Sequence, residues 1–168
     1  EVFPASQTIS GTVTHAVQSA RNGLTTFDLR LYRTLSVSSV LVNGKSAAYT
    51  RPTDEVKITL DRTYNQGEPF TVAVSYAGAP ARLFYGSFNF STHGSARMPI
   101  IWSLSEPWYA YSWWACKESN TDKHTLEVWV TSPSNLTALA NGRLQGQDAL
   151  SGSRTRYRWK TDYPLCTY

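Results

Sequence analysis

Alternation of apolar and polar residues runs through most of this chain and limits what it can fold into. The stretch "EVKITL" places Val56, Ile58 and Leu60 on one side and Lys57 and Thr59 on the other. Successive side chains of a β-strand point to opposite faces, so this period of two predicts a strand with one buried face. The same period is found in residues 8–17, 24–32, 70–78, 124–133 and 154–164.

Asn-Gly pairs occur at Asn22–Gly23, Asn43–Gly44 and Asn141–Gly142. This pair favours tight hairpin turns because both residues tolerate the left-handed backbone that such turns need. Many short strands separated by turns predict an all-β fold, either a β-sandwich or a curved pair of sheets.

Other segments carry no clear strand pattern. Residues 79–101 mix Gly, Pro and aromatic residues, and we expect them to be irregular. We expect a short strand within residues 135–140 and a turn-rich loop over residues 146–153. The one place where a short helical turn is expected is residues 107–114.

The size and composition fit one folded unit. The chain has 168 residues, of which 41% are hydrophobic and 17% charged, so a globular rather than a disordered protein is predicted. No internal repeat or low-complexity linker is visible, and we predict a single domain over residues 1–168. No apolar run approaches the roughly 18 residues that a membrane-spanning helix needs.

The sequence does not decide where the protein resides. The first residues, "EVFPASQTIS", lack a basic segment followed by an apolar one, so we expect no signal peptide among them. A cytoplasmic location and an exported, periplasmic or extracellular one both stay open.

The net charge of +4 raises the question of a nucleic-acid partner. The densest basic cluster, "RTRYRWK", places Arg154, Arg156, Arg158 and Lys160 on one face of a predicted strand. A solvated outer face explains this pattern better than a phosphate-binding patch does, and we predict no nucleic-acid partner.

No self-contained catalytic or metal-binding motif is present. The chain lacks HExxH, GxSxG and a phosphate-binding glycine loop. His124 and Glu127 are three residues apart, so on a strand they point to opposite faces and make a poor metal pair. Cys116 and Cys166 could form a disulfide or stay free, since spacing alone does not decide.

Aromatic residues gather in the stretch "SLSEPWYAYSWWACKESNTDK", residues 103–123. Trp108, Trp113 and Trp114 lie in it and Trp102 just before it. Clustered aromatic residues usually belong to a core, but they also stack on sugars. A stand-alone β-sandwich module that binds carbohydrate or protein is therefore an alternative.

The same stretch resembles the N-terminal β-domain of the M1 zinc aminopeptidases, the aminopeptidase N and leukotriene A4 hydrolase family. The family pattern is T-Q-x-E-P-x-x-A-R-x-x-F-P-C-x-D-x-P-x-x-K, and it aligns here without a gap. Glu106, Pro107, Ala110, Cys116 and Lys123 match it. "ISGTVT", "VSYAGAP" and "PLCTY" are similar to other parts of that domain, so the resemblance covers nearly the whole chain.

Some positions depart from the family pattern. Leu104 stands where the family has Gln and Tyr111 where it has Arg. Ala115 and Asn120 replace prolines, and Glu118 replaces Asp. These departures concern the substrate pocket more than the fold, and they leave the activity of the parent enzyme open.

The resemblance implies a saddle-shaped β-sandwich of mostly antiparallel strands. It also implies that this domain is non-catalytic and that the zinc site, an HExxH motif with a later Glu, lies in a downstream catalytic domain. The expected partners are thus that catalytic domain and the N-terminus of a peptide substrate. By itself this chain should bind no zinc and cleave nothing.

The resemblance further implies roles for two residues. Glu106 stands where the family's acid binds the free α-amino group of the substrate. Leu104 stands where the family lines the pocket for the first side chain. We also expect Trp108, Trp113 and Trp114 to pack against the sandwich and in part against the catalytic domain, which would leave an apolar patch exposed here.

Overall fold

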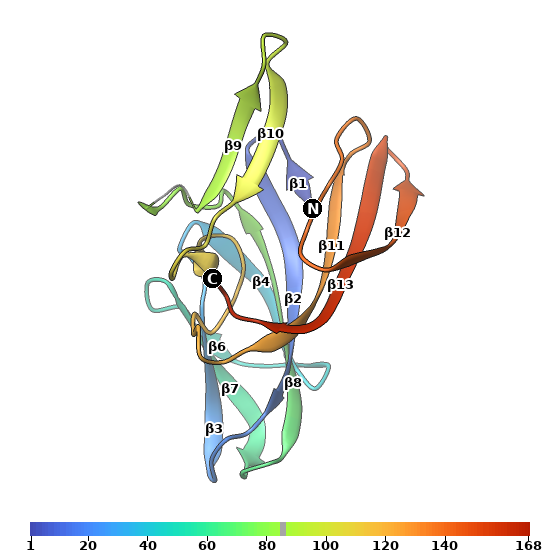
Figure 1. Ribbon diagram of the computed structural model, residues 1–168. Helices are drawn as coiled ribbons and strands as arrows, with labels where there is room; N and C mark the ends of the chain where they lie inside the picture. The colour runs from blue at the N-terminus through green and yellow to red at the C-terminus, as the bar shows by residue number, and fades with distance from the viewer. Residues whose placement is uncertain (85–86) are drawn as a thin grey trace.

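The computed structural model describes residues 1–84 and 87–168 and forms an all-β protein (Figure 1). No α-helix occurs in these two ranges, and a short 3-10 helix, η2, spans Ala110–Ser112. The strands are β1 Val2–Phe3, β2 Thr8–Gln18, β3 Leu24–Arg30, β4 Leu35–Val42, β5 Lys45–Ser46, β6 Tyr49–Thr50, β7 Glu55–Tyr64, β8 Pro69–Gly78, β9 Phe88–His93, β10 Met98–Ser103, β11 His124–Pro133, β12 Arg143–Leu150 and β13 Arg154–Leu165.

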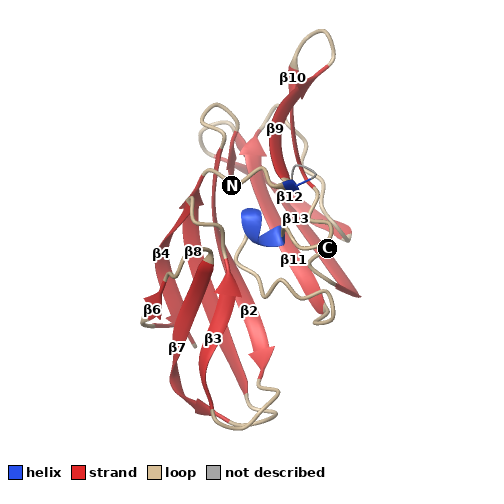
Figure 2. Cartoon of the chain, turned by 90° about the vertical axis from the view of Figure 1, so that its left-hand side faces the viewer, coloured by secondary structure: helices blue, strands red, loops and turns tan. Residues whose placement is uncertain are grey.

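Two antiparallel sheets face each other and enclose the core (Figure 2). One has the strand order β1-β2-β8-β4-β5 and the other β3-β7-β6. Val56 and Ile58 of β7 and Val72 and Val74 of β8 have no exposed surface. These residues alternate with polar ones, as the sequence pattern predicted for strands with one buried face. Because two antiparallel sheets enclose the core, the predicted β-sandwich is confirmed.

The Asn43–Gly44 pair joins β4 to β5 as predicted. Asn43 has φ +50° and Gly44 φ +78°, so both residues have the left-handed backbone of a tight hairpin turn. Gly142 precedes β12 with φ +102°, where a Cβ atom would stand 2.2 Å from the Lys160 carbonyl oxygen. Only glycine fits that close approach.

A third sheet, β11-β13-β12, stands beside the sandwich (Figure 2). Three of the four basic residues on β13 form ion pairs, and only Lys160 of the four is fully exposed, so the face is less solvated than expected. These pairs are Arg154–Glu1, Arg158–Asp148 and Lys160–Asp162. On the opposite face of β13, Tyr157 and Trp159 donate hydrogen bonds to the carbonyls of Leu136 and Ala138. The segment before β12 thus covers that face.

Three sequence expectations about secondary structure were wrong. Residues 88–103 form the hairpin β9–β10, which projects from the body of the molecule, where an irregular segment was expected (Figure 1). Its strand "MPIIWS" carries apolar residues on both faces, so it lacks alternation. The expected strand in residues 135–140 is a turn and coil, and β12 occupies most of the expected loop at residues 146–153.

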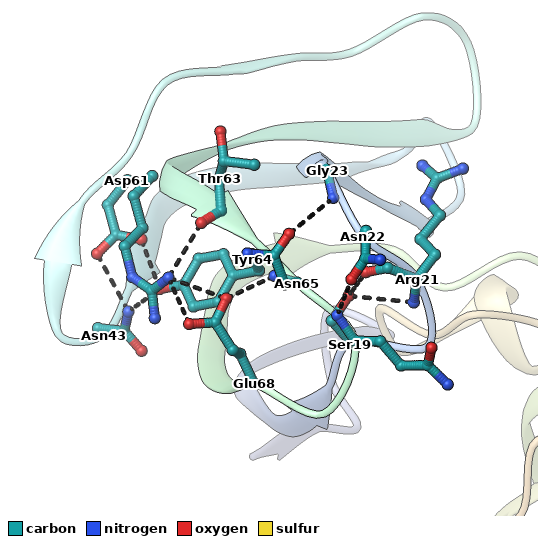
Figure 3. A network of polar contacts seen from close by, with 12 residues as sticks. Ser19, Arg21, Asn22, Gly23, Asn43, Asp61, Thr63, Tyr64, Asn65 and Glu68 are labelled. Atoms are coloured by element: carbon teal, nitrogen blue, oxygen red, sulfur yellow. Dashed lines mark hydrogen bonds and ion pairs between the residues drawn. The ribbon is translucent and has the colours of Figure 1, made fainter.

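Side-chain hydrogen bonds link the turns between β2 and β3, between β4 and β5, and between β7 and β8. We name this group of contacts the turn-end network, and Figure 3 shows it from close by. Its central residue is Tyr64, 1% exposed, whose hydroxyl donates to Asp61 (2.7 Å) and accepts from Asn43 (2.6 Å). The other members are Ser19, Arg21, Asn22, Gly23, Arg62, Thr63, Asn65, Gln66 and Glu68.

Candidate functional site

The aromatic stretch folds as an irregular segment around η2. The Glu118 carboxylate accepts hydrogen bonds from the backbone N–H groups of Ala110 (3.2 Å) and Tyr111 (3.0 Å). Partial burial raises the pKa of Glu118, because desolvation disfavours its charged form. Next to it, Cys116 exchanges backbone hydrogen bonds of 2.7 and 3.0 Å with Arg30 of β3. Glu118 thus holds η2 within the segment, whereas Cys116 attaches the segment to the sandwich. Cys116 and Cys166 are both free thiols.

Trp113 and Trp114 pack against the core, as expected. The Trp113 ring lies 5.6 Å from Phe88, and the Trp114 ring stacks on His15 at 6.4 Å. Trp108, by contrast, is 57% exposed. One aromatic run therefore supplies both core packing and exposed surface.

His15 joins β2 to this segment. Its Nε2 lies 2.9 Å from the Ala115 carbonyl oxygen, and burial lowers the pKa of the imidazole. The neutral form is favoured in this position, so His15 serves as a structural contact. Among residues 1–84 and 87–168, no group of three or more His, Cys, Asp or Glu side chains is placed to hold a metal ion, so His15 is part of no such group.

Glu106 and Leu104 lie together in the loop between β10 and η2, which we name the Glu106 loop (residues 104–107). The Leu104 N–H donates to the Ser87 carbonyl (2.9 Å), and the buried Ser105 accepts a hydrogen bond from Trp113 Nε1 (3.3 Å). The Glu106–Pro107 peptide bond is cis. Leu104 remains 38% exposed.

The Glu106 side chain is half-buried. Interaction with Glu106 raises the pKa of the Tyr168 phenol. Within the described ranges, no Lys, Arg or His nitrogen lies within 4.0 Å of the Glu106 carboxylate, although seven other acids have such a partner. Its charge is therefore free to attract a cation from outside the chain.

Sequence reasoning did not assign roles to the residues that support this loop. Asn120 Nδ2 donates to the Pro107 carbonyl (2.9 Å), and Thr167 Oγ1 donates to Asn120 Oδ1 (3.3 Å). These contacts join residues 13 and 47 positions apart in the chain. No local pattern reveals such a contact.

Exposed apolar side chains occur in the Glu106 loop and in the segments of the chain on either side of it. Ile100 and Trp102 of β10 are each 40% exposed, Phe84 is 63% exposed, and Leu104 and Trp108 belong to the same stretch of chain. Two surface hollows lie elsewhere, one lined by residues 16–18, 43 and 69–71 and one by residues 142, 143, 145 and 160–163. Neither hollow contains a tryptophan, so they give no support to a sugar-binding platform.

Comparison with known proteins identifies relatives of the whole chain. The family model of the Peptidase M1 N-terminal domain matches residues 1–168. Comparison with curated protein sequences gave no match. No helix in the described ranges is long and apolar enough to cross a membrane.

Solved structures with the same fold come from bacteria and yeast. The M1 zinc metallopeptidase of Deinococcus radiodurans is 26% identical with a TM-score of 0.83, and the match covers 98% of this chain and 37% of that one. A mutant of that metallopeptidase bound to a Tyr-Ser-Ala substrate gives 26% identity and a TM-score of 0.83, over 100% and 38% of the two chains.

Yeast LTA4 hydrolase in complex with bestatin is 17% identical with a TM-score of 0.73, over 99% of this chain and 26% of that one, and shows the fold alone. This chain therefore spans little more than a third of the bacterial enzyme.

Proposed function

This chain belongs to the Peptidase M1 N-terminal domain family, and on that premise we propose that residues 1–168 form one domain that supplies a wall of the substrate site in a zinc aminopeptidase. In this proposal Glu106 binds the free α-amino group of the peptide. The observation that carries the proposal is the Glu106 carboxylate itself, which is half-buried in a well-supported loop. Among residues 1–84 and 87–168, no Lys, Arg or His nitrogen forms an ion pair with it.

A fixed carboxylate suits the recognition of a peptide N-terminus. An ammonium group would form charge-assisted hydrogen bonds with the Glu106 oxygens, which are shorter and stronger than neutral ones. Because that contact fixes the first residue of the substrate, it also fixes which peptide bond reaches the catalytic group. The result is removal of one residue at a time.

Leu104 fits the role of a contact for the first substrate side chain. It lies two residues before Glu106 in the same loop, and 38% of its surface is exposed. Its apolar side chain favours an apolar substrate residue, since burying such a pair removes apolar surface from water.

Zinc and the catalytic groups would come from another part of the parent enzyme. The structural relatives from Deinococcus radiodurans are zinc metallopeptidases, while the described residues of this chain form no cluster of zinc ligands. The exposed apolar residues around the Glu106 loop, Ile100, Trp102 and Trp108 among them, are suited to cover by a catalytic domain. The substrate would then bind between the two domains.

The test uses the full-length protein, its zinc content and its hydrolysis of aminoacyl-anilides. Glu106→Ala is expected to lower kcat/KM by about 30- to 4,000-fold, the range for removing one partner of a buried charge pair, with zinc content unchanged. Glu55→Ala, which removes an exposed acid on β7, is the matched control and should change neither quantity. Unchanged activity of Glu106→Ala would overturn the role of Glu106, and a full-length protein without zinc or cleavage would overturn the peptidase function.

A further inference from the structure

Ser105 is the most deeply buried residue of the Glu106 loop. It is 8% exposed, whereas Leu104 before it is 38% exposed and Glu106 after it is half-buried. A buried hydroxyl needs a hydrogen-bond partner, because leaving it unpaired costs free energy. Trp113 Nε1 donates to Ser105 Oγ at 3.3 Å, and the Tyr109 N–H donates to the Ser105 carbonyl oxygen at 3.1 Å. Both the side chain and the backbone of Ser105 are therefore held.

The Trp113 ring that binds Ser105 is itself held by the core. It packs 5.6 Å from the ring of Phe88, the first residue of β9, and belongs to the aromatic residues packed against the sandwich. Ser87, directly before β9 and fully buried, accepts the Leu104 N–H through its carbonyl oxygen at 2.9 Å. The loop is thus tied to the start of β9 directly at Leu104 and through Trp113 at Ser105.

We infer that Ser105 is a positioning residue, whose buried hydroxyl, bonded to Trp113, fixes the direction of the neighbouring Glu106 side chain toward the α-amino group of the substrate. This inference rests on the proposed role of Glu106. Trp113 is the rigid support of the contact, and neither Ser105 nor Trp113 touches the substrate.

The geometry of the chain links the two neighbouring side chains. Successive side chains of an extended segment point to opposite sides. With Ser105 turned inward, Leu104 and Glu106 on either side of it are turned outward, which agrees with the alternating exposure of the three residues. Without the contact at Ser105 the Glu106 carboxylate would sample more orientations, and substrate binding would have to offset the entropy of holding it again.

A hydrogen bond adds direction to the packing of this loop. An apolar side chain at position 105 could fill the same space, but it would leave the indole N–H of Trp113 without an acceptor. Hydrogen bonds weaken steeply as they depart from linear geometry, so the contact restricts the rotation of Ser105 more than packing alone does. The M1 family pattern leaves positions 105 and 113 open, so membership of the family does not imply this pair.

The first experiment measures competitive inhibition of the full-length protein by leucine and by N-acetyl-leucine. Ser105→Ala should raise the inhibition constant of leucine by about three- to tenfold, the net contribution of one hydrogen bond. The constant of N-acetyl-leucine should stay the same, because acetylation removes the charge that Glu106 binds. Ser103→Ala, at an exposed serine two residues earlier, is the matched control and should change neither constant. An unchanged constant of leucine in Ser105→Ala would overturn the inference.

A double-mutant cycle with Trp113→Phe separates positioning from stability. Ser105→Ala alone leaves a buried indole N–H without an acceptor, so it should lower the free energy of unfolding. In the Trp113→Phe background that donor is absent, and Ser105→Ala should have little further effect on unfolding or on leucine binding. Strictly additive effects of the two substitutions on leucine binding would show that the contact between them does not position Glu106.

A second readout does not depend on activity. In full-length protein labelled with 15N-tryptophan, the indole N–H signal of Trp113 is identified by its absence in Trp113→Phe. We expect this N–H to exchange with heavy water more slowly in the wild type than in Ser105→Ala, because the hydrogen bond protects it. Equal exchange in both proteins would overturn the contact and the inference with it.

The two proposals fail in different ways. If Glu106→Ala weakens leucine binding but Ser105→Ala does not, the positioning role of Ser105 is wrong while the role of Glu106 stands. If Glu106→Ala leaves leucine binding unchanged, the proposed function fails and the positioning role fails with it, even where the exchange of the indole N–H shows the contact.

Discussion

The turn-end network and the Glu106 loop use polar side chains in opposite ways. In the network, Asp61 accepts from Tyr64 and Asn43, and Glu68 pairs with Arg62, so each acid has a partner within the chain (Figure 3). In the Glu106 loop the acid forms no ion pair with the part of the chain that the structure describes, and the neighbouring Leu104 and Trp108 stay exposed. The comparison suggests that the first region serves the stability of the fold and the second serves contacts outside this chain.

Among these variants, Tyr64→Ala should disrupt the turn-end network and lower the stability of the fold the most. Tyr64 is 1% exposed and its ring lies 4.7 Å from Phe70. We expect the free energy of unfolding to fall by about 3–5 kcal/mol, as for other buried aromatic residues replaced by Ala. Urea unfolding measures this loss.

Tyr64→Phe isolates the hydroxyl that bonds Asp61 and Asn43. It should cost about 1 kcal/mol, the net value of a typical hydrogen bond. A Tyr64→Ala variant as stable as the wild type would contradict the structural role of the network.

Trp113 and Trp108 belong to the same aromatic stretch but should contribute differently to the stability of the fold. Trp113 packs on Phe88 in the core, whereas Trp108 is 57% exposed. Trp113→Ala should lower the free energy of unfolding by about 2–4 kcal/mol. Trp108→Ala should change it by no more than about 0.5 kcal/mol, because exposed side chains contribute little to stability. Equal losses in urea unfolding would show that Trp108 belongs to the core and not to an interaction surface.

His15 should make the free energy of unfolding depend on pH. Burial lowers its pKa in the folded state below the ordinary 6.5, so at lower pH the unfolded chain binds more protons there than the folded one. The stability that His15 contributes is thus complete above pH 6.5 and is lost as the pH falls toward the folded-state pKa. The loss is about 1.4 kcal/mol for each unit by which the pKa is lowered.

Urea unfolding across this pH range checks the prediction for His15. His15→Gln should remove this part of the pH dependence, while His93→Gln, at an exposed position of β9, should retain it. An unchanged pH profile in His15→Gln would contradict the account of a buried neutral imidazole.

Much of the sandwich could be predicted because its strands are amphipathic. Val56 and Ile58 face the core and Lys57 faces water, and burial on one face leaves a period of two in the sequence. The hairpin β9–β10 escaped prediction for the opposite reason. On β10, Ile101 packs toward the core while Ile100 and Trp102 on the other face stay exposed, so both faces are apolar.

The candidate site was predictable only in part. Glu106 is a candidate because its neighbours match a family pattern, and nothing in its local sequence distinguishes it from an ordinary loop acid before a proline. Asn120 carries no pattern at all, since its contact with the Glu106 loop depends on the folded path of the chain.

Competitive inhibition by a free amino acid and by its N-acetylated form would test the role of Glu106 most directly. Acetylation removes the positive charge of the amino group and leaves the side chain intact. We predict that the full-length wild-type enzyme binds the free amino acid much more tightly than the acetylated form, and that Glu106→Ala loses most of this preference through weaker binding of the free form. A preference of equal size in both proteins would contradict the proposal that Glu106 binds the α-amino group.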